Sequence, residues 1–413
     1  GLLIKGIIPG AGLGSICEIH PNIGGDIFFA EVVGFEKKYV LMMPLGEVRG
    51  VGLGSKIILK SMRATIHVGE ELLGRVLNGM GEVIDNKGEL ITSEDVPLYA
   101  DVKNPLNREP IRKPLSLGVR AIDGLNTVGQ GQRVSILAGS GVGKSMLMGM
   151  VAEFTDADIN VIALIGERGR EVREFIEDRL GEGGLKKSVV VVATSDESPL
   201  VRMRGAFVAT TIAEYFSKQG KNVLLMMDSV TRFAMAQREI GLSVGEPPTT
   251  KGYTPSVFTM LPKLLERAGN FCNEGSITGL YTVLVEGDDL DDPIADSVRS
   301  IADGHIVLSR KLAEKSHFPA IDILKSSSRV MLNVVNEAHV KMNQFLRRNL
   351  SIYSESEDLI NIGAYKDGSS SSIDQAIAYN ESINQFLQQS HKEKSEFLET
   401  EEIMKQICGL GER

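Results

Sequence analysis

Residues 134–151 read VSILAGSGVGKSMLMGMV and change from a strand to a glycine-rich turn and then to a helix. The run 134–138 is apolar at nearly every position, which is typical of a strand buried on both faces. Apolar residues recur at helical spacing after the turn: Met146, Leu147, Met150 and Val151. A strand, a glycine-rich loop and a helix in this order are the context that a phosphate-binding P-loop requires.

The loop has the composition that phosphate recognition needs. Its glycines allow backbone N–H groups to point into one concavity, and the helix N-terminus adds partial positive charge. Lys144 is predicted to reach the β- and γ-phosphates of ATP, and Ser145 to bind Mg²⁺ through its hydroxyl. Ala138 stands where the general pattern has glycine, and a small residue can still serve there. The predicted nucleotide-binding residues of the loop are Gly139, Ser140, Gly141, Val142, Gly143, Lys144, Ser145 and Met146.

Apolar strand-like runs alternate with helical patterns on both sides of this loop. Such alternation predicts an α/β fold with a parallel sheet. The expected strands are 134–138, 161–166, 189–195, 222–228, 281–287 and 305–309.

The ends of the chain have a different texture. Residues 1–66 are short strand-like runs separated by glycine, which predicts a small N-terminal β-barrel. Strands stop after about residue 340, and apolar residues then recur at helical spacing, with SSIDQ offering Ser372 and Gln375 as a capping box. We therefore expect a barrel over 1–66, an α/β domain over 67–340 and a helical domain over 341–413. The chain opens GLLIKGIIPG in a strand-like pattern without Met, so we expect an N-terminal truncation.

Two predicted strands end on acidic residues at the sheet edge where nucleotides bind. Asp228 ends NVLLMMD and is predicted to hold Mg²⁺ through water. LIGERGREV, residues 164–172, places Glu167 and Arg168 at the same edge. Glu167 is the predicted base or water-orienting residue, and Arg168 a phosphate contact. Spacing alone leaves open that this pair belongs to a surface ion-pair cluster.

Composition excludes some classes of protein. The chain has 413 residues, with 42% hydrophobic and 24% charged, as in soluble globular proteins. Its net charge of −9 disfavours a general nucleic-acid binder. No apolar run approaches the roughly 20 residues that cross a bilayer. The acidic stretch 286–296 leaves two interpretations, a metal cluster or, as we expect, a solvated loop near a subunit interface.

The motifs together carry a family resemblance. PAIDILKSSS, residues 319–328, fits a signature of proline, small residue, aliphatic residue, aspartate, three residues and then serine–x–serine. This signature is similar to that of the rotary ATP synthase catalytic subunit superfamily. Further matching stretches are AGSGVGKS, LIGERGREV, MDSVTRFAMAQREIGLSVGEPP, KGYTPSVF, VEGDDLDDPIADSVRSIADGHIVLSR and IGAY. They resemble the bacterial type III protein export ATPases of flagella and injectisomes, over essentially the whole chain and least in 1–66 and 369–413.

The resemblance implies an N-terminal β-barrel, a RecA-like ATPase core and a C-terminal helical domain. It implies a homohexameric ring that hydrolyses ATP with Mg²⁺ at subunit interfaces. Lys144 and Ser145 match the P-loop pair, Glu167 the catalytic glutamate, Arg168 its neighbouring phosphate contact, and Asp228 the Walker B aspartate.

Three further positions gain a role from the resemblance. Arg329 falls where these enzymes carry the arginine finger, which would act on the neighbour's γ-phosphate. The alternative for Arg329 is a local salt bridge, for example with Asp322. Phe318 falls where the synthase subunit stacks an aromatic ring on adenine, and ordinary packing is its alternative. Arg232 matches the arginine after the Walker B strand, with a supporting or interface role.

The resemblance also implies partners and a location. These are the export apparatus, stator and stalk-like proteins, export substrates and chaperones, with no nucleic acid. The chain is expected in the cytoplasm at the cytoplasmic face of the inner membrane, peripheral and not inserted. MAQREI and GAY at 363–365 favour the flagellar branch, whereas the opening GLLIKGIIPGAGLGSICEI favours the injectisome branch. We expect the flagellar one.

Two other classes are weighed against this expectation. A Rho-like RNA-translocating hexamer shares the RecA-type core, but its barrel should interleave basic and aromatic residues, unlike residues 1–66. A non-catalytic nucleotide-binding subunit should lack Lys144 or Glu167, and this chain has both.

Overall fold

The apolar runs predicted as strands assemble into one central sheet. The computed structural model describes residues 3–92, 94–285, 287 and 289–409. Within these residues the sheet has nine strands in the order β18-β17-β11-β16-β14-β12-β13-β7, with β15 paired to β16. All neighbours are parallel except the pairs made by β15 and β18. The strands are β7 (Val76–Asn78), β11 (Arg133–Ala138), β12 (Ile159–Ile165), β13 (Ser188–Ala193), β14 (Asn222–Asp228), β15 (Gly269–Asn270), β16 (Ser276–Leu284), β17 (Gly304–Leu308) and β18 (Ile321–Ser328).

The α/β prediction is confirmed, with corrections at the sheet edges. The edge strands β7 and β18 were not expected, because neither is a continuous apolar run. Strand β16 begins earlier than the predicted 281 and ends at Leu284, before the glutamate and glycine that the prediction included.

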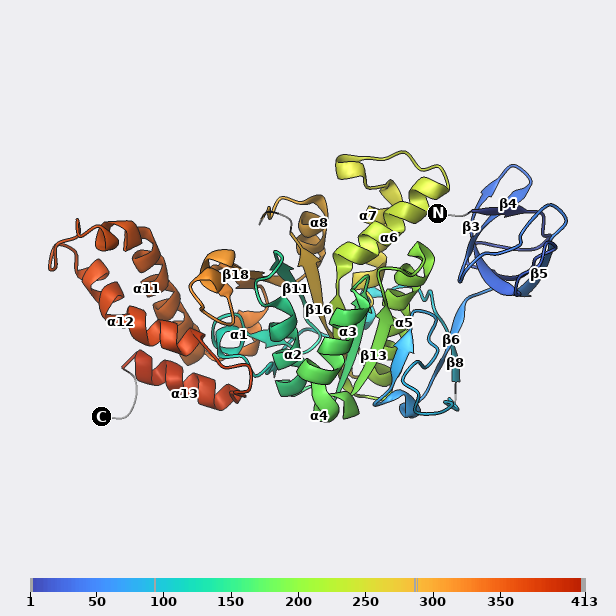
Figure 1. Cartoon of the computed structure of the whole chain (residues 1–413). Coiled ribbons are helices and arrows are strands. Elements are labelled where there is room, and N and C mark those ends of the chain that lie inside the picture. Colours follow the sequence, from blue (N-terminus) through green and yellow to red (C-terminus); the bar gives the residue numbers. More distant parts are fainter. Residues whose placement is uncertain (1–2, 93, 286, 288, 410–413) are drawn as a thin grey trace.

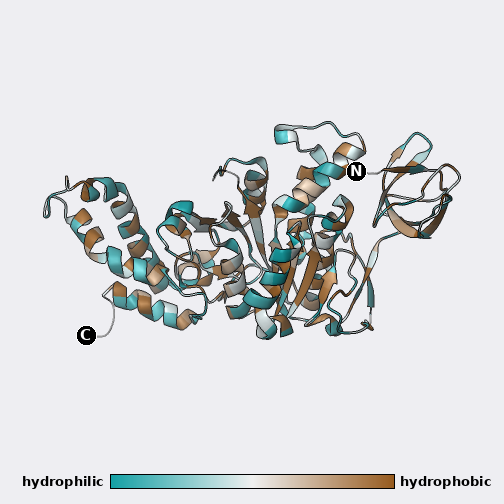
Figure 2. Cartoon of the chain, viewed as in Figure 1, coloured by the Kyte–Doolittle hydropathy of each residue, from teal (hydrophilic) through white to brown (hydrophobic). Residues whose placement is uncertain are grey.

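Helices cover both faces of the sheet (Figure 1). Alternate residues of β12 face opposite ways: Val161 and Ala163 join the cluster under α5 and α6, whereas Ile162 and Leu164 join the cluster under α1 and α2. The core helices are α1 (Arg120–Leu125), α2 (Lys144–Phe154), α3 (Gly169–Glu174), α4 (Gly181–Lys186), α5 (Pro199–Lys218), α6 (Val230–Ser243), α7 (Pro255–Leu265), α8 (Pro293–Ile301), α9 (Arg310–Glu314) and α10 (Met331–Val334). Figure 2 shows hydrophobic residues concentrated in the central strands and polar residues on the outer sides of the helices.

The N-terminal strands form a separate curled sheet with its own apolar cluster. Its antiparallel order is β1-β4-β3-β2-β5. The two edge strands approach each other, because a Cβ atom on Gly6 of β1 would lie only 2.1 Å from Cδ1 of Ile57 on β5. The sheet is therefore rolled into a barrel-like shape. The strands are β1 (Ile4–Gly6), β2 (Ile16–His20), β3 (Phe28–Glu36), β4 (Tyr39–Pro44) and β5 (Lys56–Ser61), and two short pairs, β6 (Thr65–Val68) with β8 (Glu94–Pro97) and β9 (Pro114–Leu115) with β10 (Val128–Gly129), follow.

A buried ion pair joins this N-terminal sheet to the core. Glu31 on β3 accepts from Arg204 of α5 at 2.5 Å and from the hydroxyl of Tyr99 at 2.8 Å. The side chains of Glu31 and Arg204 are 5% and 3% exposed, so this contact excludes water and fixes the approach of the two parts.

The C-terminal part consists of three helices at the opposite end of the molecule (Figure 1). They are α11 (Glu337–Asn361), α12 (Ser371–Leu387) and α13 (Phe397–Ile407). The predicted capping box at Ser372 and Gln375 is wrong: α12 begins at Ser371, and the hydroxyls of Ser370 and Ser372 contact each other instead. The capping box lies in α13, between Glu396 and Glu399. No helix within the described ranges combines the length and hydropathy that a membrane crossing needs.

Candidate active site

The P-loop lies at the carboxyl end of β11, a strand in the interior of the sheet. Gly141 and Gly143 have φ angles of +76° and +89°, a conformation that side chains disfavour and glycine adopts freely. Helix α2 begins at Lys144, so its N-terminal N–H groups face the loop. Loop and helix form one wall of a cleft of about 1210 Å³.

Three predicted residues from separate strands meet at this loop. Asp228 ends β14, Glu167 follows β12, and the ammonium group of Lys144 lies between their carboxylates. Nζ of Lys144 contacts Oδ1 of Asp228 and lies 3.7 Å from Oε1 of Glu167. All three side chains are at most 16% exposed, so the charges interact with little solvent screening.

Thr282 supports this arrangement. Its hydroxyl donates to Oδ1 of Asp228 at 2.7 Å, from strand β16, which lies between β11 and β14. In the sequence, Thr282 stands out only as a polar residue within the apolar run YTVLV. This signal alone did not connect Thr282 with the site.

The local electrostatics give Glu167 an unusual proton affinity. Burial raises the pKa of Glu167 from 4.5 to about 7, with the Asp228 charge adding to the effect and Lys144 opposing it. A carboxyl group with a pKa near the working pH can accept a proton and release it again. The pKa of Glu167 lies in this range, and its role as the base stays a prediction.

The donor set fits a nucleotide with a divalent metal ion. Mg²⁺ prefers oxygen ligands and usually binds through one or two carboxylates together with phosphate oxygens. Ser145 offers a hydroxyl at the start of α2, and Asp228 offers a carboxylate already oriented by Thr282. The loop N–H groups and Lys144 provide the positive counterpart for phosphate.

Phe318 lies in the same cleft. A Cβ atom on Gly143 would be 3.4 Å from the Phe318 ring, and the ring is 44% exposed. The backbone N–H of Gln389 donates to the carbonyl of Phe318 at 3.0 Å. The Phe318 side chain thus lies beside the P-loop and is partly open to solvent.

Two arginines predicted to belong to the site, Arg232 and Arg168, differ in how deeply they are buried. The Arg232 side chain packs along Gly166, where an added Cβ would be 2.8 Å from Cβ of Arg232, and it lines the cleft. Its Nε is buried without a hydrogen-bond partner within the described part of the chain. Arg168 also lines the cleft, but its side chain is 82% exposed and forms an ion pair with Glu171 at 3.7 Å.

Arg329 is far from the P-loop of its own chain. It follows β18, which runs antiparallel to β17, and its backbone N–H donates to the carbonyl of Asp303 at 2.9 Å. The backbone N–H of Asp303 in turn donates to the carbonyl of Arg133, the first residue of β11. The P-loop begins at the other end of β11, about 17 Å away at roughly 3.3 Å per residue. The alternative salt bridge with Asp322 is not formed, since Asp322 pairs with Lys325 at 3.9 Å.

The sequence did not predict that the C-terminal part would contribute to this cleft. Gln389, Ser390 and His391 line it, together with the P-loop and residues from many other segments of the core. Lys251 also lines it and pairs with Asp289 and Asp292 of the acidic stretch at 3.1 and 3.3 Å. The metal-cluster interpretation of that stretch falls partly outside the described residues, because 286 and 288 are not among them.

A chain that carries its phosphate loop on an interior strand of a mostly parallel sheet, with carboxylates from the neighbouring strand ends facing the P-loop lysine, is a RecA-like P-loop ATPase.

Comparison with known proteins specifies the family. The model of the ATP synthase alpha/beta family, nucleotide-binding domain, matches residues 118–328, and that of the T3SS EscN ATPase C-terminal domain matches 335–406. The chain belongs to the ATP synthase alpha/beta family and groups there with the ATPases of flagellar and type III secretion systems.

Individual relatives span nearly the whole chain. A flagellum-specific ATP synthase of Bacillus subtilis (strain 168) is 52% identical, covering 100% of this chain and 94% of the relative. A type 3 secretion system ATPase of Xanthomonas euvesicatoria is 50% identical over 96% of this chain and 89% of the relative. The solved structure of the assembled ATPase EscN from enteropathogenic E. coli superimposes with a TM-score of 0.92 at 48% identity, covering 98% of each chain.

Proposed function

We propose that this export ATPase hydrolyses Mg²⁺-ATP with Lys144, Ser145, Glu167 and Asp228 as the core of its site. The supporting observation is the placement of Lys144 between the carboxylates of Glu167 and Asp228 at the mouth of the P-loop. Bound Mg²⁺ neutralises charge on the β- and γ-phosphate oxygens. Ser145 and Asp228 would hold the ion, Asp228 through water, and Lys144 would bind the phosphates.

In this proposal Glu167 orients the attacking water and accepts its proton. The raised pKa of Glu167 supports this assignment, because a base near pH 7 combines availability with proton affinity. Phe318 stacks on the adenine with its exposed ring face. Arg168 contacts phosphate from the rim of the cleft, and Arg232 supports the site from beside Gly166.

The proposal extends to a homohexameric ring in which Arg329 acts on the neighbour's γ-phosphate. Arg329 lies at the start of β11, opposite the P-loop end, so an arginine side chain cannot span the separation within one chain. Two solved structures of assembled EscN, one of them in complex with its central stalk EscO, support an oligomer with a stalk-like partner.

We assign the chain to the flagellar branch, with the injectisome branch as the alternative. Its support is the GAY sequence at 363–365, the MAQREI stretch and the 52% identity to a flagellum-specific relative. The high TM-score to EscN favours the alternative. The proposal includes contacts with the export apparatus, stator proteins, export substrates and chaperones. It places the protein at the cytoplasmic face of the inner membrane. It divides the chain into an N-terminal barrel over 1–66, an ATPase core over 67–340 and a helical domain over 341–413.

The decisive experiment mixes two inactive variants. Arg329→Ala keeps its own pocket and loses the finger, whereas Lys144→Ala keeps the finger and loses the pocket. If the finger acts in trans, mixed rings contain some complete interfaces, and ATPase activity rises above the sum of the separate variants.

Co-assembly is established first by native mass or crosslinking, so that the mixture is a valid test. A cis finger leaves no complete site in any mixed interface, and the activity then stays at the sum. Titration of each variant into the wild-type protein shows whether several intact sites must act together, because the loss is then steeper than proportional.

A further inference from the structure

The three serines before Arg329 are not equivalent. Ser326 is buried, accepts from the N–H of Val307 at 2.9 Å and donates to the carbonyl of Asp322 at 2.6 Å. Ser327 is exposed on the opposite face of β18. The hydroxyl of Ser328 donates to the carbonyl of Thr127 at 2.7 Å, so it ties the end of β18 to the segment before β10.

A buried amide makes the second connection to Ser328. Gln132 is 0% exposed, and its Nε2 donates to Oγ of Ser328 at 3.2 Å and to the carbonyl of Asp303 at 3.0 Å. Its Oε1 accepts from the N–H of Gly129 at 2.8 Å. One side chain thus joins three segments: the turn before β11, the turn before β17 and the end of β18.

The backbone is packed closely around this amide. A Cβ atom on Gly304 would lie 2.6 Å from the carbonyl oxygen of Ser327 and 3.1 Å from Nε2 of Gln132. Glycine at this position allows the two strands and the amide to come together, and a larger residue would separate them.

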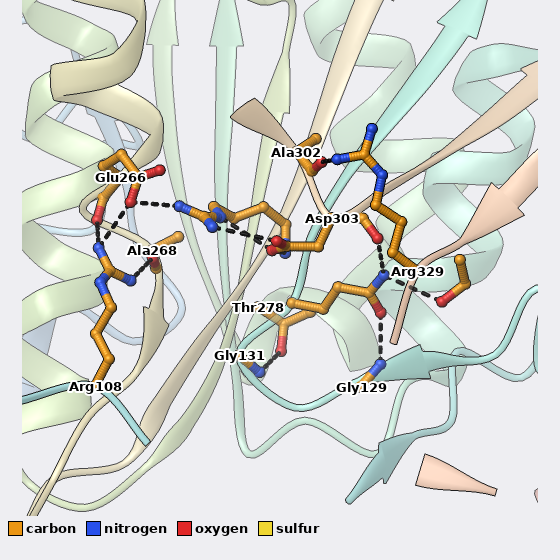
Figure 3. A network of polar contacts seen from close by, with 12 residues as sticks. Arg108, Gly129, Gly131, Glu266, Ala268, Thr278, Ala302, Asp303 and Arg329 are labelled. Atoms are coloured by element: carbon orange, nitrogen blue, oxygen red, sulfur yellow. Dashed lines mark hydrogen bonds and ion pairs between the residues drawn. The ribbon is translucent and has the colours of Figure 1, made fainter. Parts of the chain in front are cut away.

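The guanidinium of Arg329 is held by carbonyl groups and not by a carboxylate. Nη1 donates to the carbonyl of Ala302 at 3.2 Å (Figure 3). Nη2 donates to the carbonyl of Arg299 at 3.4 Å, and both carbonyls lie at the carboxyl end of α8, which favours a cation. The nearby carboxylate of Asp303 binds Arg133 instead, at 3.1 Å. Among the described residues Arg329 has no ion-pair partner, so its charge is available to an incoming phosphate.

We propose that Gln132 and Ser328 are positioning residues, which set the backbone of Arg329 so that its guanidinium is presented to the nucleotide of the adjacent copy. The inference rests on the proposed trans role of Arg329. The amide of Gln132 is buried and hydrogen-bonded next to the residue that precedes Arg329. Such a rigid, fully bonded group can hold the backbone of Arg329 in place, so that its long, exposed side chain keeps one direction.

Steady-state kinetics provide the first test. Ser328→Ala removes one hydroxyl and is expected to lower kcat about threefold to tenfold, the range that one lost hydrogen bond spans. Gln132→Met keeps the length of the side chain and loses every hydrogen bond of the amide. It is expected to lower kcat about 10- to 100-fold. Binding of a non-hydrolysable ATP analogue stays unchanged in both, because the P-loop is at the other sheet edge. Ser328→Thr, which keeps the hydroxyl, restores turnover, and the exposed neighbour Ser327→Ala serves as the matched control.

Mixing separates a positioning role from a general loss of structure. Gln132→Met mixed with Lys144→Ala should recover activity above the sum, because the second chain supplies an intact finger. Gln132→Met mixed with Arg329→Ala should not recover, because every interface then lacks a working finger.

The outcomes distinguish this inference from the proposed function. If the reference mixture of Lys144→Ala and Arg329→Ala does not recover, the trans finger is refuted and the inference fails with it. If the reference recovers but Gln132→Met recovers with both partners or with neither, the inference alone is refuted. If Gln132→Met does not fold, wild-type kcat in Ser328→Ala refutes it, and a loss reversed by Ser328→Thr supports it.

Discussion

The pH dependence of ATP hydrolysis tests the assignment of Glu167 as the base. Burial raises the pKa of Glu167 to about 7, and only the ionised carboxylate can accept a proton from water. At pH 6 about one tenth of the groups are ionised, and at pH 8 about nine tenths, so kcat/KM should rise about tenfold over this interval. An ordinary glutamate with a pKa near 4.5 would be fully ionised throughout, and the profile would then be flat.

The assay measures phosphate release at constant free Mg²⁺ and constant ionic strength. The ratio kcat/KM is the appropriate quantity, because it reports the ionisation of the free enzyme, the state in which Glu167 is described. Glu167→Gln should lower kcat by about 10²-fold. It should also abolish the enzyme's contribution to the fall of kcat/KM at low pH, the acid limb of the profile. Any pH dependence that remains in this variant belongs to the nucleotide and is subtracted.

A second variant, at the rim of the cleft, should shift the pH profile while leaving Glu167 itself unchanged. Glu171 raises the pKa of Glu167 through a side-chain hydrogen bond and its charge, and Glu171 itself is exposed. Glu171→Gln should therefore lower the pKa of Glu167 and move the acid limb to lower pH. A flat wild-type profile between pH 6 and 8, or Glu167→Gln with near-normal turnover, would refute the assignment.

Three further predictions concern binding, assembly and stability. Lys144→Ala should abolish ATP binding or turnover, as measured by binding of an ATP analogue and by phosphate release. Unchanged activity in this variant would refute the P-loop assignment. Specific activity should rise with protein concentration, since a finger in trans needs a neighbour; constant specific activity with a monomer by light scattering across the range would contradict the ring. Glu31→Ala should leave Arg204 buried and unpaired and destabilise the N-terminal attachment by about 3–5 kcal/mol, seen as a lower denaturation midpoint. Glu36→Ala, at an exposed ion pair with Lys5, should change the midpoint far less and is its control.

Features encoded by short stretches could be predicted from the sequence. The P-loop is one continuous segment, so its glycines, Lys144 and Ser145 indicate their roles by order alone. The interior strands β11 to β14 were recognisable because strands covered on both faces are apolar at nearly every position. Asp228 was recognisable because it ends such a strand.

Edge strands and helix ends were harder to predict. Strand β18 carries ILKSSS with one face exposed, and its hydrogen bonds come from a single neighbour, so its sequence does not differ from that of a loop. The capping box was misplaced because serine caps a helix only where the backbone turns suitably, and the four consecutive serines at 369–372 offer several choices.

The sequence by itself determined the phosphate loop, the alternation that makes an α/β sheet, and the family signature at 319–328, which Arg329 follows. Only the tertiary structure decided that Thr282 orients Asp228, that Gln389 to His391 enter the cleft, and that Gln132 braces Ser328. The reason is the strand order: β16 lies between β11 and β14, and antiparallel β18 carries Arg329 back to the edge opposite the P-loop. Contacts between segments so distant in sequence depend on how the whole chain packs, and no local pattern of residues records them.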